Sequence, residues 1–288
     1  MSPADQEFLE LRPRMFGLAY RMLGSRSDAE DVLQDAWLRW QGAEQRELRS
    51  PEAWLTTVVT RLSIDRLREA KKERERYTGP WLPEPLVEEG EVPEHAVELA
   101  SDVSMAFLMV LEQLAPEERA VFLLREVFDV DYPELAQMLG KNQAACRQIL
   151  HRARERVREG RPRFQVNPEA HRRLLDRFAE ATSSGDPGKL LALFADSVRV
   201  TGDGGGKVRA VLHTLEGAER VVRFYSAISR LTAGRVSYRH VEINGEPGLL
   251  RFLDGRLDAA ISVVTDGIRI LDVYTVRNPD KLRHITAA

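Results

Sequence analysis

The spacing of the apolar residues changes character near residue 167, and this change constrains the fold more than any other feature. Before it, apolar residues recur every three to four positions, which is typical of amphipathic helices. Beyond two further helical stretches, at about 168–183 and 187–195, the chain consists mainly of short runs rich in Val, Ile and Tyr, which are typical of strands. We therefore expect a multidomain protein in which helical domains precede a separate α+β domain.

The helical part is interrupted between residues 77 and 103. Prolines distributed through this segment prevent a regular helix. Residues 81–103 contain seven Asp or Glu and no Lys or Arg, which predicts an exposed, extended tether. The expected divisions are a helical domain at 1–76, a linker at 77–103, a helical domain at 104–162 and an α+β domain at 167–288.

Capping signals indicate where several helices begin and end. Ser27-x-x-Glu30 has the pattern of a capping box. Ser50-Pro51 has the pattern of an N-cap followed by proline in the first turn. Gly140 has the position of a glycine just past a helix C-terminus.

The last part of the chain predicts hairpins and one more helix, at about 217–230. Asp254-Gly255 and Asp266-Gly267 are turn signals that favour antiparallel pairing. The expected strands are Val198–Thr201, Val208–His213, Val236–Ile243, Leu249–Leu253, Leu257–Val264 and Ile268–Val276.

Composition narrows the class of protein. The chain has 288 residues, a formal net charge of −3 and a single cysteine, Cys146, which excludes an intrachain disulfide and a multi-cysteine zinc site. No apolar run approaches the roughly 18–20 residues that span a bilayer. The first ten residues lack the pattern of a secretory signal. We expect a cytoplasmic protein with no membrane partner and no cofactor.

Residues 131–158 have the pattern of a helix-turn-helix. The 23 residues from Lys141 to Arg163 contain eight basic and two acidic residues, although the whole chain is nearly neutral. A basic helix with amide side chains can enter the major groove of DNA, and a solvated basic face is the alternative interpretation. On a helical wheel, the apolar arc contains Cys146, Ile149, Leu150, Ala153 and Val157, and the opposite arc contains Gln143, Ala144, Arg147, Gln148, His151, Arg152 and Arg154.

Two polar faces stand out in the first helical domain. Asp28, Asp31 and Asp35 share one face of a helix, on the side opposite its tryptophans. This face suits a basic partner, and solubility together with charge near a helix N-terminus is the alternative. The next helix carries threonines and arginines that can contact phosphates and unstacked bases, namely Thr56, Thr57, Thr60, Arg61 and Arg68.

The motifs in combination resemble a known family. SRSDAEDVLQDAWLRW (25–40) and SPEAWLTTVVTRLSIDRLREAKK (50–72) resemble region 2 of bacterial extracytoplasmic-function (ECF) sigma factors. Residues 114–154 resemble region 4 of the same family. Three further motifs match the subfamily with a SnoaL-like C-terminal extension, namely Trp81-Leu82-Pro83-Glu84-Pro85, Asp203-Gly204-Gly205-Gly206-Lys207 and Asn278-Pro279-Asp280-Lys281-Leu282.

The resemblance implies promoter recognition as part of the RNA polymerase holoenzyme. It implies that the loop at about 41–50 helps to melt the minus-ten element, where a flipped base is read in a pocket. The residues that it assigns to the polymerase core are Asp31, Gln34 and Asp35. Those that it assigns to the minus-ten element are Thr57, Arg61, Asp65 and Arg68, and those for the minus-thirty-five element are Gln143, Ala144, Arg147, Gln148, His151 and Arg152.

The C-terminal domain has three interpretations. SnoaL-like domains resemble a cone-shaped α+β fold that also hosts isomerases and cyclases, which need a base facing an oxyanion donor, and such a domain can also hold a small ligand. Fold alone does not imply catalysis, and spacing does not assign such a pair. The residues that could supply a catalytic base or an oxyanion donor are His213, Tyr225, Tyr238, His240, Asp258 and Asp272.

The favoured interpretation is regulation by contact within the chain, in place of a separate anti-sigma factor. We expect the Asp203–Lys207 loop and the Trp81 segment to lie at an interface between the C-terminal domain and region 2, which would set the spacing of the two DNA-binding regions. An ordinary hairpin turn and packing of Trp81 on its own domain are the alternatives. A regulator that binds DNA without polymerase is the second functional class, and a DNA-binding enzyme is a third.

Overall fold

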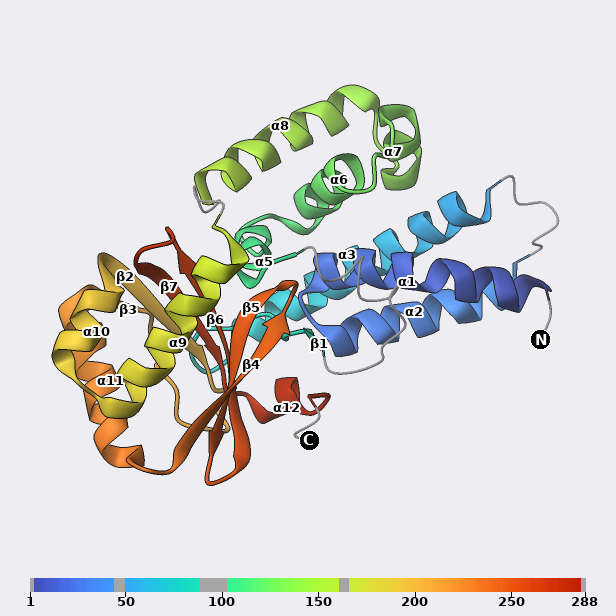
Figure 1. Ribbon diagram of the computed structural model, residues 1–288. Coiled ribbons are helices and arrows are strands. Elements are labelled where there is room, and N and C mark those ends of the chain that lie inside the picture. The colour runs from blue at the N-terminus through green and yellow to red at the C-terminus, as the bar shows by residue number, and fades with distance from the viewer. Residues whose placement is uncertain (1–2, 44–49, 89–102, 161–165, 286–288) are drawn as a thin grey trace. The chain divides into compact units, whose positions relative to one another are not determined.

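The computed structural model describes residues 3–43, 50–88, 103–160 and 166–285, and these residues form two compact units. Among the described residues, the first unit contains those up to Glu75, Val103, and those from Phe107 to residue 160. The second contains the first part of the linker, from Arg76, together with Ser104–Ala106 and the C-terminal domain (Figure 1). In the described residues, no helix is both long and apolar enough to cross a membrane.

Three helices form the first half of the first unit: α1 (Pro3–Leu23), α2 (Arg26–Gln41) and α3 (Pro51–Arg74). They pack around buried side chains that include Tyr20 and Trp40. The Ser50 hydroxyl accepts a hydrogen bond of 3.2 Å from the backbone N–H of Ala53, and Pro51 lies in the first turn, as the N-cap signal predicts.

The predicted start of α2 is wrong by two residues. The Ser25 hydroxyl caps the helix by accepting a hydrogen bond of 3.2 Å from the backbone N–H of Asp28, and Ser27 lies inside the first turn. Ser25 and Ser27 each have an acidic residue three positions later, Asp28 and Glu30, and the two hydroxyls lie 3.0 Å apart. Gly24, at a φ of 64°, ends α1 directly before Ser25, and this early break fixes the cap.

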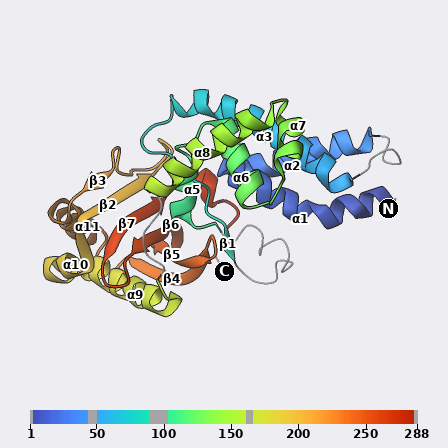
Figure 2. The same ribbon diagram turned by 90° about the horizontal axis from the view of Figure 1, so that it is seen from above.

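The second half of the first unit is also helical, with α5 (Met105–Leu111), α6 (Pro116–Glu126), α7 (Tyr132–Leu139) and α8 (Gln143–Gly160). Gly140 ends α7 at a φ of 62° and opens the turn into α8, so the helix-turn-helix is present. Helix α6 packs against both α1 and α3 (Figure 2). The predicted apolar arc of α8 is confirmed, because all five of its residues are buried: Cys146, Ile149, Leu150, Ala153 and Val157.

The second unit contains a mixed seven-stranded sheet with the order β1-β4-β5-β6-β7-β2-β3. The pairing is antiparallel except between β2 and β7, which are parallel. The strands are β1 (Val87–Glu88), β2 (Phe194–Asp203), β3 (Leu215–Glu216), β4 (Val236–Ile243), β5 (Glu246–Leu253), β6 (Arg256–Thr265) and β7 (Ile270–Val276).

Three helices pack on one face of this sheet: α9 (Pro168–Ser184), α10 (Pro187–Leu193) and α11 (Ala218–Thr232) (Figure 1). Phe178 and Tyr225 meet edge to face at 5.4 Å in the core between helices and sheet. A fourth, short helix, α12 (Pro279–Leu282), follows β7. The expected fold class, two helical regions and an α+β domain, is confirmed.

Two expectations for the second unit are wrong. The segment expected as a strand at Val208–His213 is irregular, because the Gly204 carbonyl accepts the amides of Lys207 and Val208 at 3.0 and 3.2 Å and closes a turn instead. The linker is also not wholly exposed. Leu82 and Glu84 are 0% and 6% exposed, and Val87–Glu88 pairs with β4 as an edge strand. The acidic run at Glu89 and beyond lies outside the described residues.

Candidate functional site

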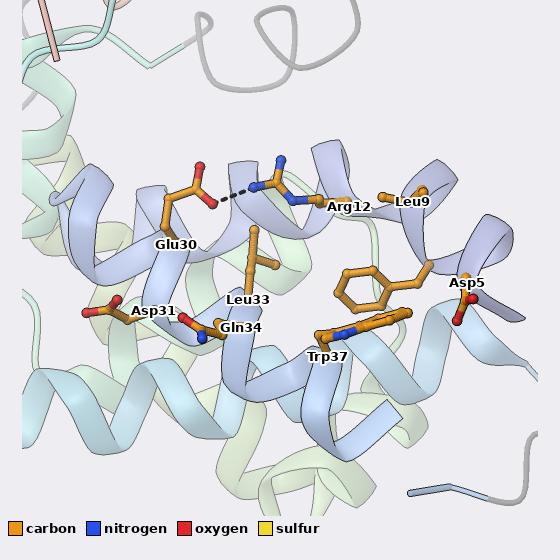
Figure 3. A pocket seen from close by; sticks show the side chains of 9 residues that line it. Asp5, Leu9, Arg12, Glu30, Asp31, Leu33, Gln34 and Trp37 are labelled. Atoms are coloured by element: carbon orange, nitrogen blue, oxygen red, sulfur yellow. Dashed lines mark hydrogen bonds and ion pairs between the residues drawn. The ribbon is translucent and has the colours of Figure 1, made fainter. Parts of the chain in front are cut away.

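A groove with a volume of about 520 Å³ runs between α1 and α2 (Figure 3). Its apolar part includes Trp37, whose ring meets that of Phe8 at 4.7 Å. An ion pair of 2.5 Å between Arg12 and Glu30 joins the two helices at the groove. The lining residues are Asp5, Phe8, Leu9 and Arg12 from α1 and Glu30, Asp31, Leu33, Gln34 and Trp37 from α2.

The three acidic residues of α2 that the sequence places on one helix face have different surroundings. Asp31 and Gln34 line the same groove as Trp37. The Asp28 carboxylate instead accepts a hydrogen bond of 2.9 Å from Nε of Arg66, on α3. Asp35 is exposed and is not among the residues that line the groove. The groove therefore combines an apolar floor with acidic and amide side chains.

The polar residues of α3 are occupied by contacts within the first unit. The Thr57 hydroxyl donates to the Ala53 carbonyl at 2.8 Å. The Arg61 Nε donates to the Met138 carbonyl, at the end of α7, at 3.0 Å. Arg68 forms an ion pair of 3.0 Å with Asp65 on its own helix.

Helix α8 presents a continuous polar face. The Arg147 guanidinium donates to Gln143 Oε1 at 3.3 Å and lies 4.8 Å from the centre of the Tyr132 ring, which holds the side chain against α7. Buried apolar residues on the opposite arc fix the orientation of this face. All six residues expected to read DNA are exposed: Gln143, Ala144, Arg147, Gln148, His151 and Arg152.

In the second unit, the Asp203 carboxylate is fully buried and accepts four hydrogen bonds. Two come from the linker, from the Tyr77 hydroxyl at 2.6 Å and the Leu82 amide at 2.9 Å. The other two come from the Gly205 amide at 3.0 Å and the Lys281 ammonium at 2.7 Å. A buried carboxylate requires such partners, and here they join the linker to the C-terminal domain.

Lys281 makes the complementary contacts. Its ammonium donates to the Leu82 carbonyl and lies 4.1 Å from the centre of the Trp81 ring, a cation–π contact. The Asn278 amide nitrogen donates to the Tyr77 hydroxyl at 2.9 Å. The linker is therefore held through both its backbone and its aromatic side chains.

The three glycines allow this close approach. Gly205 has a φ of 61°, and a Cβ there would overlap the Asn278 side chain. A Cβ on Gly206, at a φ of 69°, would meet the Thr78 side chain at 3.1 Å. Lys207 forms an ion pair with Asp280. The loop thus brings residues 77–82 and 278–281 together, and an ordinary hairpin turn does not account for it.

The rest of the linker motif is bound further along the domain. Glu84, 6% exposed, lies 3.2 Å from His284 Nδ1, and His284 Nε2 lies 2.7 Å from the Pro85 carbonyl oxygen. The Leu86 amide donates to Asn244 Oδ1 at 3.2 Å. Pro83 and Pro85 are buried, as is Leu82. Pro279 begins α12, whose Leu282 is also buried.

Sequence reasoning missed Tyr77, Asn244 and His284. Tyr77 precedes the linker motif, Asn244 lies in a hairpin turn at a φ of 55°, and His284 follows the last motif. Positive φ at an asparagine is a turn signal, but only the tertiary fold shows that its side chain faces the linker. We call the set of contacts between residues 77–86 and the C-terminal domain the linker latch.

The residues considered for catalysis are engaged structurally. Asp258 is held by Arg251 at 2.8 Å and by Arg277 at 2.6 Å. Burial alone would raise the pKa of Asp258, but hydrogen bonding to Arg277 and the charge of Arg251 lower it overall. Asp272 pairs with Arg199 at 2.6 Å. These two carboxylates are therefore paired with cations in the fold.

The other candidates are placed similarly. The Tyr238 hydroxyl shares a hydrogen bond of 2.9 Å with Thr182, and burial raises the pKa of both Tyr225 and Tyr238. His240 lies 2.9 Å from Asp176 on the surface, and His213 is exposed.

Comparisons with known proteins agree with this architecture. Residues 8–73 match the family model described as Sigma-70 region 2, and residues 104–157 match that described as Sigma-70, region 4. The chain is 38% identical to the ECF RNA polymerase sigma factor SigJ of Mycobacterium tuberculosis, over 96% of this chain and 92% of SigJ. It is 30% identical to the probable ECF RNA polymerase sigma factor SigI of the same species, over 99% of this chain and 97% of SigI.

A solved structure extends the likeness to three dimensions. The crystal structure of Mycobacterium tuberculosis SigJ matches with a TM-score of 0.78 at 34% identity, covering 96% of this chain and 98% of that chain. The match therefore includes the C-terminal domain as well as the helical regions.

The chain belongs to the ECF family of RNA polymerase sigma factors, which are transcription initiation factors and not enzymes. The family expected from the sequence motifs is confirmed.

Proposed function

We propose that this sigma factor directs RNA polymerase to specific promoters and that its own C-terminal domain regulates it by binding the linker. The burial of Asp203 against Tyr77 and Leu82 carries the regulatory part of the proposal. The linker joins the two DNA-binding regions, so a domain that holds the linker can control both.

The polymerase core is proposed to dock on α2. Asp31, Gln34 and Asp35 are exposed, and the first two line a groove with an apolar floor. A surface that combines apolar and acidic residues fits a helical partner with basic side chains.

The promoter is proposed to contact two helices. On α3, Thr57, Arg61, Asp65 and Arg68 would face the minus-ten element, together with the loop at about 41–50, of which residues 44–49 lie outside the described part of the chain. On α8, the exposed face from Gln143 to Arg152 would read the minus-thirty-five element in the major groove.

The length of the linker indicates whether the latch restrains or promotes transcription initiation. Fully extended, residues 77–103 span about 90 Å, whereas residues 89–103 span about 50 Å. The minus-ten and minus-thirty-five elements lie about 25 base pairs, or about 85 Å, apart. Holding residues 77–88 on the C-terminal domain shortens the tether between the DNA-binding regions. We therefore propose that the latch restrains initiation and that its release increases it.

Run-off transcription with purified core polymerase tests this proposal, on the promoter upstream of the protein's own gene. The full chain is compared with Lys281→Ala, with residues 1–277 and with residues 1–165. Core-dependent initiation by the full chain and a larger yield from Lys281→Ala or 1–277 are expected. Equal yields would contradict the regulatory part. Specific duplex binding with no initiation by any version would favour a regulator that acts without polymerase.

A further inference from the structure

Glu117, in the first turn of α6, binds cations from both DNA-binding regions at once. Its carboxylate pairs with Arg68 of α3 at 3.0 Å and with Lys141, in the turn before α8, at 3.0 Å. The hydrogen bond from Lys141, supported by Arg68, lowers the pKa of Glu117, so the group is charged at neutral pH. One acidic side chain thus links region 2 to the helix-turn-helix.

Glu112 forms a second and more deeply buried link. Its carboxylate pairs with Arg74 of α3 and with Arg119 of α6, the latter at 2.7 Å. The Arg119 side chain is 2% exposed and also donates to the Met22 carbonyl at 2.6 Å. Arg74 donates to the Leu23 carbonyl at 3.2 Å.

These two carbonyls belong to the last turn of α1, whose carbonyl oxygens have no amide donors within the helix. Cations are favourable at this end of the helix dipole. Region 4, through Arg119, therefore helps to cap a helix of region 2, which couples the folding of the two regions in this arrangement.

The contacts occupy the side of region 2 that is proposed to face the minus-ten element. Arg61 donates to the Met138 carbonyl and Arg68 pairs with Glu117. A carboxylate or carbonyl oxygen that accepts from a guanidinium fills the place that a phosphate oxygen takes in a DNA complex. The six reading residues of α8, in contrast, remain exposed.

The same contacts cannot persist on a promoter. Arg61 lies 3.0 Å from a residue of α7, whereas the two promoter elements lie about 85 Å apart along the duplex. Simultaneous recognition of both elements requires region 2 and region 4 to separate, and separation breaks both acidic links.

We propose that Glu112 and Glu117 form an intramolecular clasp that stands in for promoter phosphates, covers the minus-ten face of region 2 in the free protein, and leaves the minus-thirty-five helix accessible. The clasp consists of Arg68–Glu117–Lys141 and Arg74–Glu112–Arg119. This inference rests on the proposed minus-ten role of α3. It is separate from the linker latch, because all of its residues lie in the first unit.

The test uses the full chain with Glu117→Gln, and with Glu112→Gln combined with it. Glu126→Gln is the matched control, because it makes the same change of charge and removes the 2.7 Å ion pair with Arg154 inside region 4. Small-angle X-ray scattering measures the separation of the regions. Fluorescence anisotropy measures binding to a random-sequence single strand and to a random-sequence duplex, at several salt concentrations.

We expect the clasp variants to have a larger radius of gyration and an affinity for single-stranded DNA about tenfold higher than that of the wild type. The salt dependence should steepen by about 1.4 in the log–log slope, because two arginines gain phosphate contacts. Duplex binding should change no more than it does in Glu126→Gln, since the α8 face is already exposed.

An unchanged radius of gyration in Glu117→Gln, with a native thermal transition, would overturn the clasp. Gains no larger than those of Glu126→Gln would overturn the covering of the minus-ten face. Adding Arg68→Ala to Glu117→Gln separates the two proposals. A larger radius of gyration with no loss of single-strand binding on this addition would leave the clasp standing and contradict the minus-ten role of Arg68.

Discussion

The Lys281 ammonium lies 2.7 Å from the Asp203 carboxylate, in a site where the two side chains are 11% and 0% exposed. The backbone of Leu82 lies between them, since its amide donates to Asp203 and its carbonyl accepts from Lys281. Each of the two charged groups therefore binds the linker as well as its partner. The binding of the linker thus adds hydrogen bonds to both members of this buried ion pair, from the Leu82 backbone and the Tyr77 hydroxyl.

Asp203→Asn should destabilise the C-terminal domain, because it leaves the Lys281 ammonium buried beside a neutral amide. Breaking one side of a buried pair costs about 3–5 kcal/mol. Thermal unfolding followed by circular dichroism measures the loss. Asp254→Asn, which removes an exposed pair with Arg235, is the control and should have a much smaller effect. Equal shifts for the two variants would show that the Asp203 site is not held by its charge.

Gly205→Ala should open the latch. The residue has a φ of 61°, and the added Cβ would overlap the Asn278 amide that binds Tyr77. Gly234→Ala is the matched control, since its φ is 71° but no atom lies within 4 Å of the added Cβ. Both variants incur the backbone cost of about 1–2 kcal/mol. Only Gly205→Ala should increase proteolysis within residues 77–86, and equal cleavage of the two variants would contradict the role of this glycine.

Glu246 should make stability depend on pH. Burial raises its pKa from 4.5 to about 7, so the folded protein binds more protons than the unfolded chain between these values. The free energy of unfolding therefore falls as pH rises from 4.5 to 7 and changes little from this group above 7. Glu246→Gln should be more stable than the wild type at pH 8 by about 1–3 kcal/mol and should show no gain at pH 4.5.

The measurement is denaturant unfolding of both proteins at the two pH values, with Glu242→Gln as the control on the neighbouring strand. Glu242 pairs with Arg172 on the surface, so its replacement should bring no gain at pH 8. A gain for Glu246→Gln that is the same at both pH values would exclude ionisation as its cause.

Asp31→Lys should weaken binding to core polymerase by about tenfold or more, because a like charge would then face the basic partner expected at the groove. Asp31 is exposed and forms part of the groove lining, so the fold should be unaffected. Glu10→Lys is the control, since Glu10 is exposed on α1 outside the groove. Titration of labelled core polymerase gives both affinities, and unchanged affinity of Asp31→Lys would rule out this docking surface.

Local signals predicted the helices well. Ser50-Pro51, Gly140 and the apolar arc of α8 act within one or two turns of chain, so the sequence determines them directly. The strand expected at Val208–His213 failed for a tertiary reason. Its alternating residues suit a strand, but the three-glycine loop before it turns to meet residues 77–78 and 278.

The burial of charge could not be read from the linker sequence. Glu84 lies in a segment rich in acids and prolines, which is typical of an exposed tether. It is 6% exposed because His284, 200 positions later, lies beside it. The pairing of Glu117 with Arg68 likewise depends on how two helical regions pack, which no local pattern contains.

Restraint of initiation by the linker latch is tested most directly by run-off transcription with core polymerase, comparing the full chain with Lys281→Ala. Lys281→Ala removes the cation that joins Asp203, Leu82 and Trp81 without touching the proposed DNA-binding or core-binding residues. We expect core-dependent initiation by both proteins and a yield at least about threefold higher from Lys281→Ala, since residues 77–88 are released to lengthen the tether. Equal or lower yield from Lys281→Ala would contradict restraint by the latch.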